Sequence, residues 1–213
     1  MRLFLISDIH GNDNFDSIKD KIAESDLVLC AGDFTMFLPT EEGLRVAEKL
    51  ASLNPATYMV CGNCDTPDLD DLLVSKGLSI QGRSVTFSKG SERYTLAGIG
   101  GSLHTPRPTP NTWSENDLVK VLALFEPAPD IIISHQPPYG AGDTVMKTLH
   151  VGSKELARYL RNFSPILCLS GHIHEASGIF KIGQTTVVNP GSWREGHYAT
   201  AVISGRECTV TLY

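Results

Sequence analysis

The amino-acid sequence predicts an α/β fold with a mixed β-sheet system, and three observations support this prediction. Short continuous apolar runs bounded by polar residues or glycine are typical of strands buried on both faces of a sheet. Segments with helical spacing lie between these runs, and this alternation indicates parallel strands joined by right-handed crossovers. The last quarter of the chain holds short β-rich runs separated by turn residues, which favours antiparallel pairing.

Buried strands are expected at the apolar runs, with helices between them. The runs cover residues 2–7, 27–31, 58–61, 131–134 and 166–170. Apolar side chains recur at helical spacing within residues 15–22 and again within residues 44–51. Two later helices are predicted to begin at the capping residues Ser114 and Ser153, each followed by apolar residues at helical spacing.

The last quarter of the chain is expected to form an antiparallel meander. Its β-rich runs cover residues 178–182, 185–188, 199–203 and 208–212. The longest irregular stretch lies earlier, at residues 101–112, and it contains His104, Arg107 and three prolines. A loop of this size in a compact domain is more often functional than idle, so we interpret it as a functional loop.

Length and composition exclude several classes of protein. The chain has 213 residues and a formal net charge of −6, which suits a single domain over residues 1–213. No apolar run approaches the ~20 residues that span a bilayer, and the first run is too short for a signal peptide. The five cysteines lie mostly in apolar segments, which favours reduced thiols in a cytoplasmic protein. We expect no membrane partner, and the acidic balance of the chain argues against a nucleic-acid partner.

Polar residues that are able to bind metals follow each of the predicted buried strands. They are Asp8 and His10, Asp33, Asn63 with Cys64 and Asp65, His135, and His172 with His174. Because ligands bind beyond the carboxyl ends of parallel strands, these side chains are expected to converge on one crevice. Each motif alone is more often structural, but four of the seven histidines lie at these strand ends, which random placement does not explain.

The donor types in this set favour a pair of divalent metal ions. Carboxylate, imidazole and amide donors without an obligatory thiolate suit Mn, Fe, Co, Ni or Zn. Seven protein ligands are too many for one ion and suit two, with Asp33 bridging them. Two ions about 3.5–4 Å apart clamp a phosphoryl group and turn a bridging water into a nucleophile near neutral pH. This chemistry is phosphoester hydrolysis by a metal-bound hydroxide.

The ordered motifs DIH, GD, GNCD, SH and GHIH, from Asp8 to His174, resemble those of the calcineurin-like metallophosphoesterase superfamily. The Asn-Pro-Gly-Ser turn at residues 189–192 resembles one in its small single-domain phosphodiesterase-like members. The resemblance implies a four-layer fold in which two packed mixed β-sheets are flanked by helices. It also implies two metal sites, one held by Asp8, His10, Asp33 and His174 and the other by Asp33, Asn63, His135 and His172.

Two departures from the superfamily's patterns narrow the function that the resemblance implies. The residues after Asp33 lack the Val-Asp-Arg-Gly continuation of protein Ser/Thr phosphatases, which argues against protein-phosphatase activity. Many members carry a proton-donating histidine where this chain has Cys64, a substitution also found in the phosphodiesterase-like subgroup.

Four residues are candidates for catalytic roles beside the metals. Asp65 is expected to orient a metal-binding residue through a hydrogen bond, and Cys64 stands where the proton donor is expected. His150 or His104 is a candidate to supply the proton instead. For His150, an ordinary loop histidine and a substrate or proton-transfer contact are equally compatible with the sequence.

We therefore expect a dinuclear-metal-dependent phosphoesterase, manganese being one candidate metal, that hydrolyses small phosphodiesters or activated phosphomonoesters. Its expected partner is a small phosphoester, and a homo-oligomer is compatible with the sequence. Arg194 is expected either to contact this substrate or to pair with Glu195 across a turn. An interaction scaffold of the same fold ranks lower, because scaffold members have lost ligands that this chain keeps. A nuclease also ranks lower, because 213 residues leave little room for nucleic-acid-binding segments.

Overall fold

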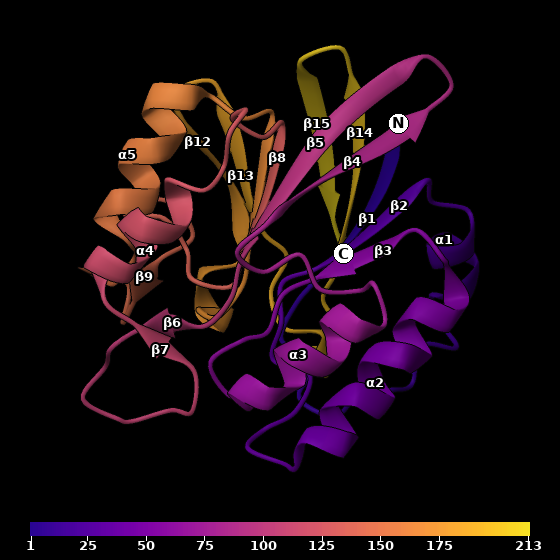
Figure 1. Ribbon diagram of the computed structural model, residues 1–213, viewed down its shortest axis with the longest axis horizontal. Helices are drawn as coiled ribbons and strands as arrows, with labels where there is room; N and C mark the ends of the chain where they lie inside the picture. Colours follow the sequence, from indigo (N-terminus) through magenta and orange to yellow (C-terminus); the bar gives the residue numbers. More distant parts are fainter.

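The computed structural model describes residues 1–213 and contains two mixed β-sheets that face each other (Figure 1). In spatial order, the first sheet consists of β15 (Glu207–Leu212), β14 (Ala199–Ser204), β1 (Arg2–Ile6), β2 (Leu27–Cys30) and β3 (Thr57–Met59). The second consists of β12 (Gly178–Ile182), β13 (Thr185–Asn189), β11 (Leu167–Ser170), β8 (Ile131–Ser134), β5 (Glu92–Ile99) and β4 (Ser84–Lys89). Parallel strands form the core of both sheets, and antiparallel hairpins complete one edge of the first sheet and both edges of the second.

The continuous apolar runs are buried on both faces, as the sequence predicts. In β1, Leu3 and Leu5 point into the core between the two sheets, whereas Phe4 and Ile6 point toward the helices on the outer face. This alternation follows from the two-residue period of a strand, which sends successive side chains to opposite faces. A strand between two apolar layers therefore needs apolar residues at every position.

Helices cover the outer face of each sheet (Figure 1). Three of them pack on the first sheet: α1 (Lys19–Ala23), α2 (Thr40–Leu53) and α3 (Pro67–Ser75). The other two, α4 (Glu115–Leu122) and α5 (Lys154–Phe163), pack on the second sheet. The four-layer arrangement of helices, sheet, sheet and helices is therefore confirmed.

The predicted caps are present, but the first helix is shorter than its sequence pattern suggests. The Ser114 side chain accepts a hydrogen bond from the Asp117 amide, and Ser153 does the same for the Leu156 amide at 3.0 Å. Phe15 and Ile18 are buried, yet both precede α1, which begins at Lys19. Their spacing therefore reflects burial of a loop that precedes the helix, and not one face of the helix.

The prediction of one antiparallel meander in the last quarter is wrong. The β12–β13 hairpin belongs to the second sheet and the β14–β15 hairpin to the first. The Asn189–Ser192 turn connects them, and the Ser192 hydroxyl donates to the Asp8 carbonyl at 2.8 Å. Sequence spacing reveals hairpins but not the sheet that receives them, because that choice depends on contacts with distant strands.

The remaining short elements surround one edge of the sheets. Residues 101–112 are largely irregular, as expected, and β6 (Ser102–Leu103) pairs with β7 (Thr112–Trp113) at the two ends of this stretch. A small hairpin consists of β9 (Thr144–Val145) and β10 (Leu149–His150). Single 3₁₀ turns, η1 (His174–Ala176) and η2 (Trp193–Glu195), follow β11 and the Asn-Pro-Gly-Ser turn.

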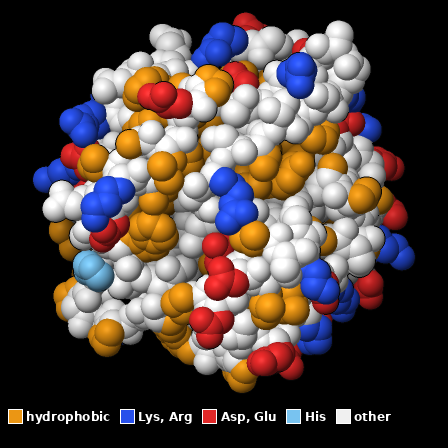
Figure 2. Space-filling view, in the orientation of Figure 1, with side chains coloured by type: hydrophobic (Ala, Val, Ile, Leu, Met, Phe, Trp, Pro, Cys, Tyr) orange, Lys and Arg blue, Asp and Glu red, His pale blue; other side chains and the backbone are white.

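None of the helices combines the length and the apolar character needed to cross a membrane. All five cysteines are free thiols, as the sequence predicts. On the face drawn in Figure 2, Lys and Arg side chains are scattered among Asp and Glu instead of gathering in a stripe.

Candidate metal centre

The polar motifs converge at the carboxyl ends of the parallel strands. Each motif follows the last residue of its strand: β1 ends at Ile6, β2 at Cys30, β3 at Met59, β8 at Ser134 and β11 at Ser170. The first three strands belong to one sheet and the last two to the other. The candidate site therefore lies where the edges of the two sheets meet.

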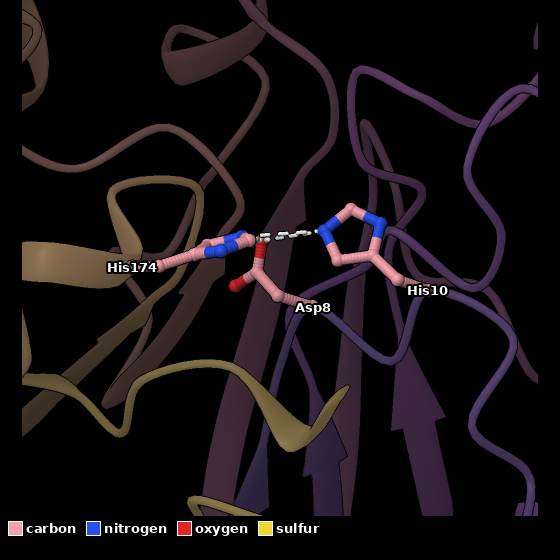
Figure 3. A group of neighbouring side chains, drawn as sticks. All are labelled: Asp8, His10 and His174. Carbon is pink, nitrogen blue, oxygen red and sulfur yellow. Dashed lines mark hydrogen bonds and ion pairs between the residues drawn. The ribbon is translucent and has the colours of Figure 1, made fainter. Parts of the chain in front are cut away.

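The first group of side chains contains Asp8, His10 and His174 (Figure 3). The two histidines approach from opposite sides with Asp8 between them. His174 Nε2 lies 3.1 Å from Asp8 Oδ1 and 3.2 Å from His10 Nε2. His10 Nδ1 faces the Thr35 carbonyl at 3.2 Å. Because a carbonyl only accepts, Nδ1 carries the proton and the His10 Nε2 lone pair faces the group.

The second group contains Asp33, Asn63, His135 and His172. His135 Nδ1 donates to the Ala31 carbonyl at 2.6 Å, so Nε2 is the ring nitrogen that faces the other side chains of the group. This Nε2 lies 3.0 Å from Asn63 Oδ1. The two rings of His135 and His172 lie with their centroids 5.2 Å apart. The side chains of this group therefore bring imidazole nitrogens and an amide oxygen close together.

Asp33 lies between the two groups. Its Oδ2 is 3.7 Å from His10 Nε2 and 3.6 Å from His135 Nε2. Two overlapping triads share Asp8: Asp8–His10–His174 and Asp8–Asp33–His135. Within each triad, one ring nitrogen or carboxylate oxygen from every residue lies within 4.8 Å of those of the other two. Asp33 thus faces an imidazole of each group.

The backbone of the site is strained and closely packed. Asp8, His10, Asp33 and His172 have positive φ values of 53°, 46°, 55° and 69°, which non-glycine residues rarely adopt. A Cβ on Gly62 would lie 1.9 Å from Asp33 Oδ1, so only glycine leaves room for this carboxylate. Strain of this kind persists where the surrounding structure enforces it, and it clusters at functional sites.

The hydrogen bond between His174 and Asp8 shifts the pKa of both groups. Burial opposes ionisation of Asp8, but the hydrogen bond from His174 and the nearby histidines outweigh it and lower the Asp8 pKa. The same hydrogen bond raises the pKa of His174. Burial lowers the pKa of His172 to about 4, so this ring is neutral at pH 7. A neutral imidazole is the form that binds metals.

Comparison with known proteins identifies the family. The family model described as Calcineurin-like phosphoesterase superfamily domain matches residues 1–204. The chain belongs to the calcineurin-like phosphoesterase superfamily. It is 36% identical over 199 residues to the uncharacterized protein MJ1162 of Methanocaldococcus jannaschii, covering 89% of this chain and 88% of that protein.

Solved structures confirm the fold of this calcineurin-like phosphoesterase. One crystal structure aligns with a TM-score of 0.80 at 18% identity and covers 99% of this chain and 98% of its own. The crystal structure of TT1561 from Thermus thermophilus aligns with a TM-score of 0.74, again at 18% identity, covering 99% of this chain and 97% of TT1561.

Two of the four candidate catalytic residues lie inside this phosphoesterase's site. Cys64 is buried, and its amide donates to Asp33 Oδ1 at 2.8 Å. Asp65 is also buried and accepts from the amides of Gly62 at 2.8 Å and Thr35 at 3.3 Å. Asp65 therefore fixes the loops that carry Asp33 and Asn63, through backbone groups rather than through a ligand's side chain.

The other two candidates lie outside the group of predicted ligands. His150 Nδ1 is 2.8 Å from the buried Asp143 carboxylate, and the His150 ring lies 5.2 Å from the Tyr139 ring. His104 is on the exposed irregular loop, where its amide donates to the Trp113 carbonyl at 3.1 Å. Arg194 does not pair with Glu195, since its guanidinium donates to Met36 Sδ at 3.5 Å.

Sequence reasoning missed several residues that support the site. The Asn189 side chain donates to the Ile173 carbonyl at 2.8 Å, between His172 and His174. The Asn111 side chain donates to the Gly62 carbonyl at 3.1 Å and thereby ties the irregular loop to the third strand's end. The Asn-Pro-Gly-Ser motif was a signal for Asn189, whereas nothing near Asn111 in the sequence indicates its partner.

Proposed function

We propose that this chain hydrolyses small phosphodiesters or activated phosphomonoesters with two divalent metal ions. One observation carries the proposal: His135 Nε2 lies 3.0 Å from Asn63 Oδ1 in a buried site, while the other ring nitrogen, Nδ1, is already bonded to the Ala31 carbonyl. The same Nε2 lies 3.6 Å from Asp33 Oδ2, so an imidazole, an amide and a carboxylate converge where a divalent cation can be held. The adjacent Asp33 carboxylate and neutral imidazoles are donors that suit Mn, Fe, Co, Ni or Zn.

The residues divide into two sets of donors that share Asp33. Asp8, His10, Asp33 and His174 would hold one ion, and Asp33, Asn63, His135 and His172 the other. When bound, a pair of divalent ions polarises the phosphoryl group and lowers the pKa of coordinated water toward neutrality. Since Asp8 and Asp33 are the only carboxylates among these ligands, a net positive charge remains to attract the anionic substrate.

The protonation of Cys64 determines which leaving groups suit the site. Burial, reinforced by the nearby Asp33 carboxylate, raises the pKa of the Cys64 thiol far above its usual range. The side chain therefore stays an S–H group, which is a weak hydrogen-bond donor. A leaving alkoxide that needs a proton gains little from it, so esters with good leaving groups are the expected substrates.

The test is activity of metal-stripped protein given one metal at a time, with bis(4-nitrophenyl) phosphate and 4-nitrophenyl phosphate as substrates. We expect hydrolysis with Mn, Co or Ni and faster turnover of the diester. Absence of hydrolysis with every metal and both substrates would contradict the proposal and favour a scaffold of the same fold.

A further inference from the structure

Two exposed apolar segments border the candidate metal centre. The first is the 36–38 tip, formed by Met36, Phe37 and Leu38, all three of which are exposed. Its neighbour Thr35 holds the His10 ring through its carbonyl. The tip therefore extends from the side of the centre that carries His10.

The second segment extends from the side of His174. It is the 146–149 tip of the β9–β10 hairpin, where Met146 is 81% exposed and Leu149 is also exposed. The Met146 amide donates at 2.7 Å to the carboxylate of Glu175, the residue after His174. Because His10 and His174 approach Asp8 from opposite sides (Figure 3), the two tips start from opposite sides of the centre.

Positive φ values are found in both tips as well as in the site. Phe37, Met146 and Lys147 have positive φ values of 59°, 50° and 67°. Together with Asp8, His10, Asp33 and His172 they account for seven of the eight non-glycine residues at positive φ. The eighth, Ser164, ends α5 as a left-handed cap, which is an ordinary role. At Met146 and Lys147 the positive φ values belong to the hairpin turn, because the Thr148 amide donates to the Val145 carbonyl at 3.2 Å, so only Phe37 is strained outside the site without such a role.

A cation accompanies the first tip. The Arg194 amide donates to the Asp8 carbonyl at 3.2 Å, and its exposed guanidinium donates to Met36 Sδ at 3.5 Å. A thioether leaves this charge uncompensated, whereas other surface arginines such as Arg45 and Arg158 are paired with carboxylates. The surface beside the candidate centre thus combines the unpaired charge of Arg194 with the exposed apolar side chains of the two tips.

We propose that the substrate is a phosphodiester with an apolar ester group, an alkyl chain or an aromatic ring, that packs between the two tips while Arg194 faces the phosphate. This inference rests on the proposed function and adds the substrate class. Apolar side chains exposed beside an anion site gain free energy when an apolar group covers them, and a polar sugar or peptide would not supply this gain.

The experiment compares 4-nitrophenyl phosphodiesters whose second ester group is methyl, butyl or hexyl. Each buried methylene contributes up to about fourfold to binding, so we expect kcat/KM to rise roughly 10- to 100-fold from methyl to hexyl. Phe37→Asn and Met146→Asn, which keep a residue that tolerates positive φ, should flatten this dependence. The matched control is Leu124→Asn, since Leu124 is 65% exposed but follows α4 outside the site.

A binding measurement separates the inference from the hydrolysis itself. Calorimetry with hexylphosphonate and methylphosphonate should show tighter binding of the hexyl compound by the metal-loaded wild type and not by the tip variants. Arg194→Met should weaken the binding of both compounds by a similar factor and leave the dependence of affinity on chain length intact.

Different failures have different meanings. Hydrolysis that is independent of chain length, or equally dependent in Phe37→Asn, overturns the apolar-substrate inference and leaves the proposed function standing. Failure to hydrolyse any diester, combined with chain-length-dependent phosphonate binding, overturns the proposed function alone. A third outcome is that wild type sediments with phosphatidylcholine vesicles, the tip variants do not, and hydrolysis shows no chain-length effect. That result would assign the tips to a membrane surface and contradict the inference.

Discussion

Asp33 is the residue on which the candidate centre depends most. Its Oδ2 lies 3.7 Å from His10 Nε2 and 3.6 Å from His135 Nε2, and its Oδ1 accepts from the Cys64 amide at 2.8 Å. The carboxylate is thus held in place by the backbone of one loop while it faces imidazoles from two sheets. A neutral amide in its place would keep the shape but remove the shared negative charge.

We therefore expect Asp33→Asn to lose bound metal and activity together. Metal analysis after gel filtration and turnover of bis(4-nitrophenyl) phosphate measure the two losses. Asp13→Asn is the matched control, because Asp13 pairs with Arg45 and Lys49 on the surface and should leave both unchanged. Two tightly bound ions in Asp33→Asn would show that the carboxylate does not bridge.

Cys64 gives a second prediction at this scale, because its thiol is a poor proton donor. Cys64→His should raise turnover of esters with alkyl leaving groups by about 10²-fold, the lower end for general-acid catalysis. Turnover of aryl esters should change much less in this variant. Cys64→Ala should have little effect on the turnover of either class of ester. The measurement is kcat on matched aryl and alkyl esters. Loss of activity in Cys64→Ala with metals still bound would make the thiol an essential participant.

At the scale of elements, the helices owe their positions to caps as well as to their apolar faces. The Ser114 hydroxyl accepts from the Asp117 amide, and the Asp117 carboxylate accepts from the Ser114 amide at 3.2 Å, so the two residues form a capping box. This signal is local, which is why the sequence alone predicts where α4 begins.

Ser114→Ala should lower the free energy of unfolding by about 1 kcal/mol, because it leaves an amide of the first turn without its acceptor. Urea denaturation followed by circular dichroism measures this change. Ser52→Ala serves as control, since Ser52 lies in α2 and its hydroxyl donates only to the Lys49 carbonyl. Equal stability of Ser114→Ala and wild type would show that the cap contributes nothing.

Asp70 in α3 should make stability depend on pH. Burial raises the pKa of Asp70, although a hydrogen bond from the Ser79 hydroxyl opposes this. Between the unfolded pKa of about 3.9 and the higher folded value, the folded state holds a proton that the unfolded state has released. Stability from this group is therefore lost as pH rises through that interval.

Asp70→Asn should remove this dependence. In chelator, the free energy of unfolding of the variant minus that of wild type should increase from pH 4 to pH 7, because only wild type loses the stability that Asp70 contributes. A constant difference between the two proteins over this interval would contradict the assignment. The comparison at two pH values separates the titration from any fixed effect of changing the contact with Ser79.

On the scale of the whole molecule, three apolar cores hold the four layers together. One lies between the sheets, and the others lie between each sheet and its helices. The cores are large enough to fold the chain without help from metal. Chelated protein should therefore lose activity but keep its circular dichroism spectrum and a cooperative thermal transition at a lower Tm. Unfolding by chelator at room temperature would contradict this.

Much of this architecture could be predicted from local sequence signals. Runs such as Ile131–Ser134 reveal strands buried on both faces, and the residues that follow them reveal the site, because both patterns are short-range. The β4–β5 hairpin escaped prediction, since β4 is half-exposed and polar at most positions. The assignment of β12–β13 and β14–β15 to different sheets also escaped, because it depends on partners far along the chain.

The pairing of β1 with β14 has a consequence for synthesis of the chain. β1 begins at Arg2 and pairs with Val202, so this strand is synthesised long before the partner on one of its sides. Until residues 199–204 emerge, one edge of β1 has no partner, and until Ser192 emerges the turn that contacts Asp8 is missing as well. A nascent chain therefore has an open sheet edge and an incomplete centre while the residues between β1 and β14 are synthesised, and open edges of this kind can aggregate or bind chaperones.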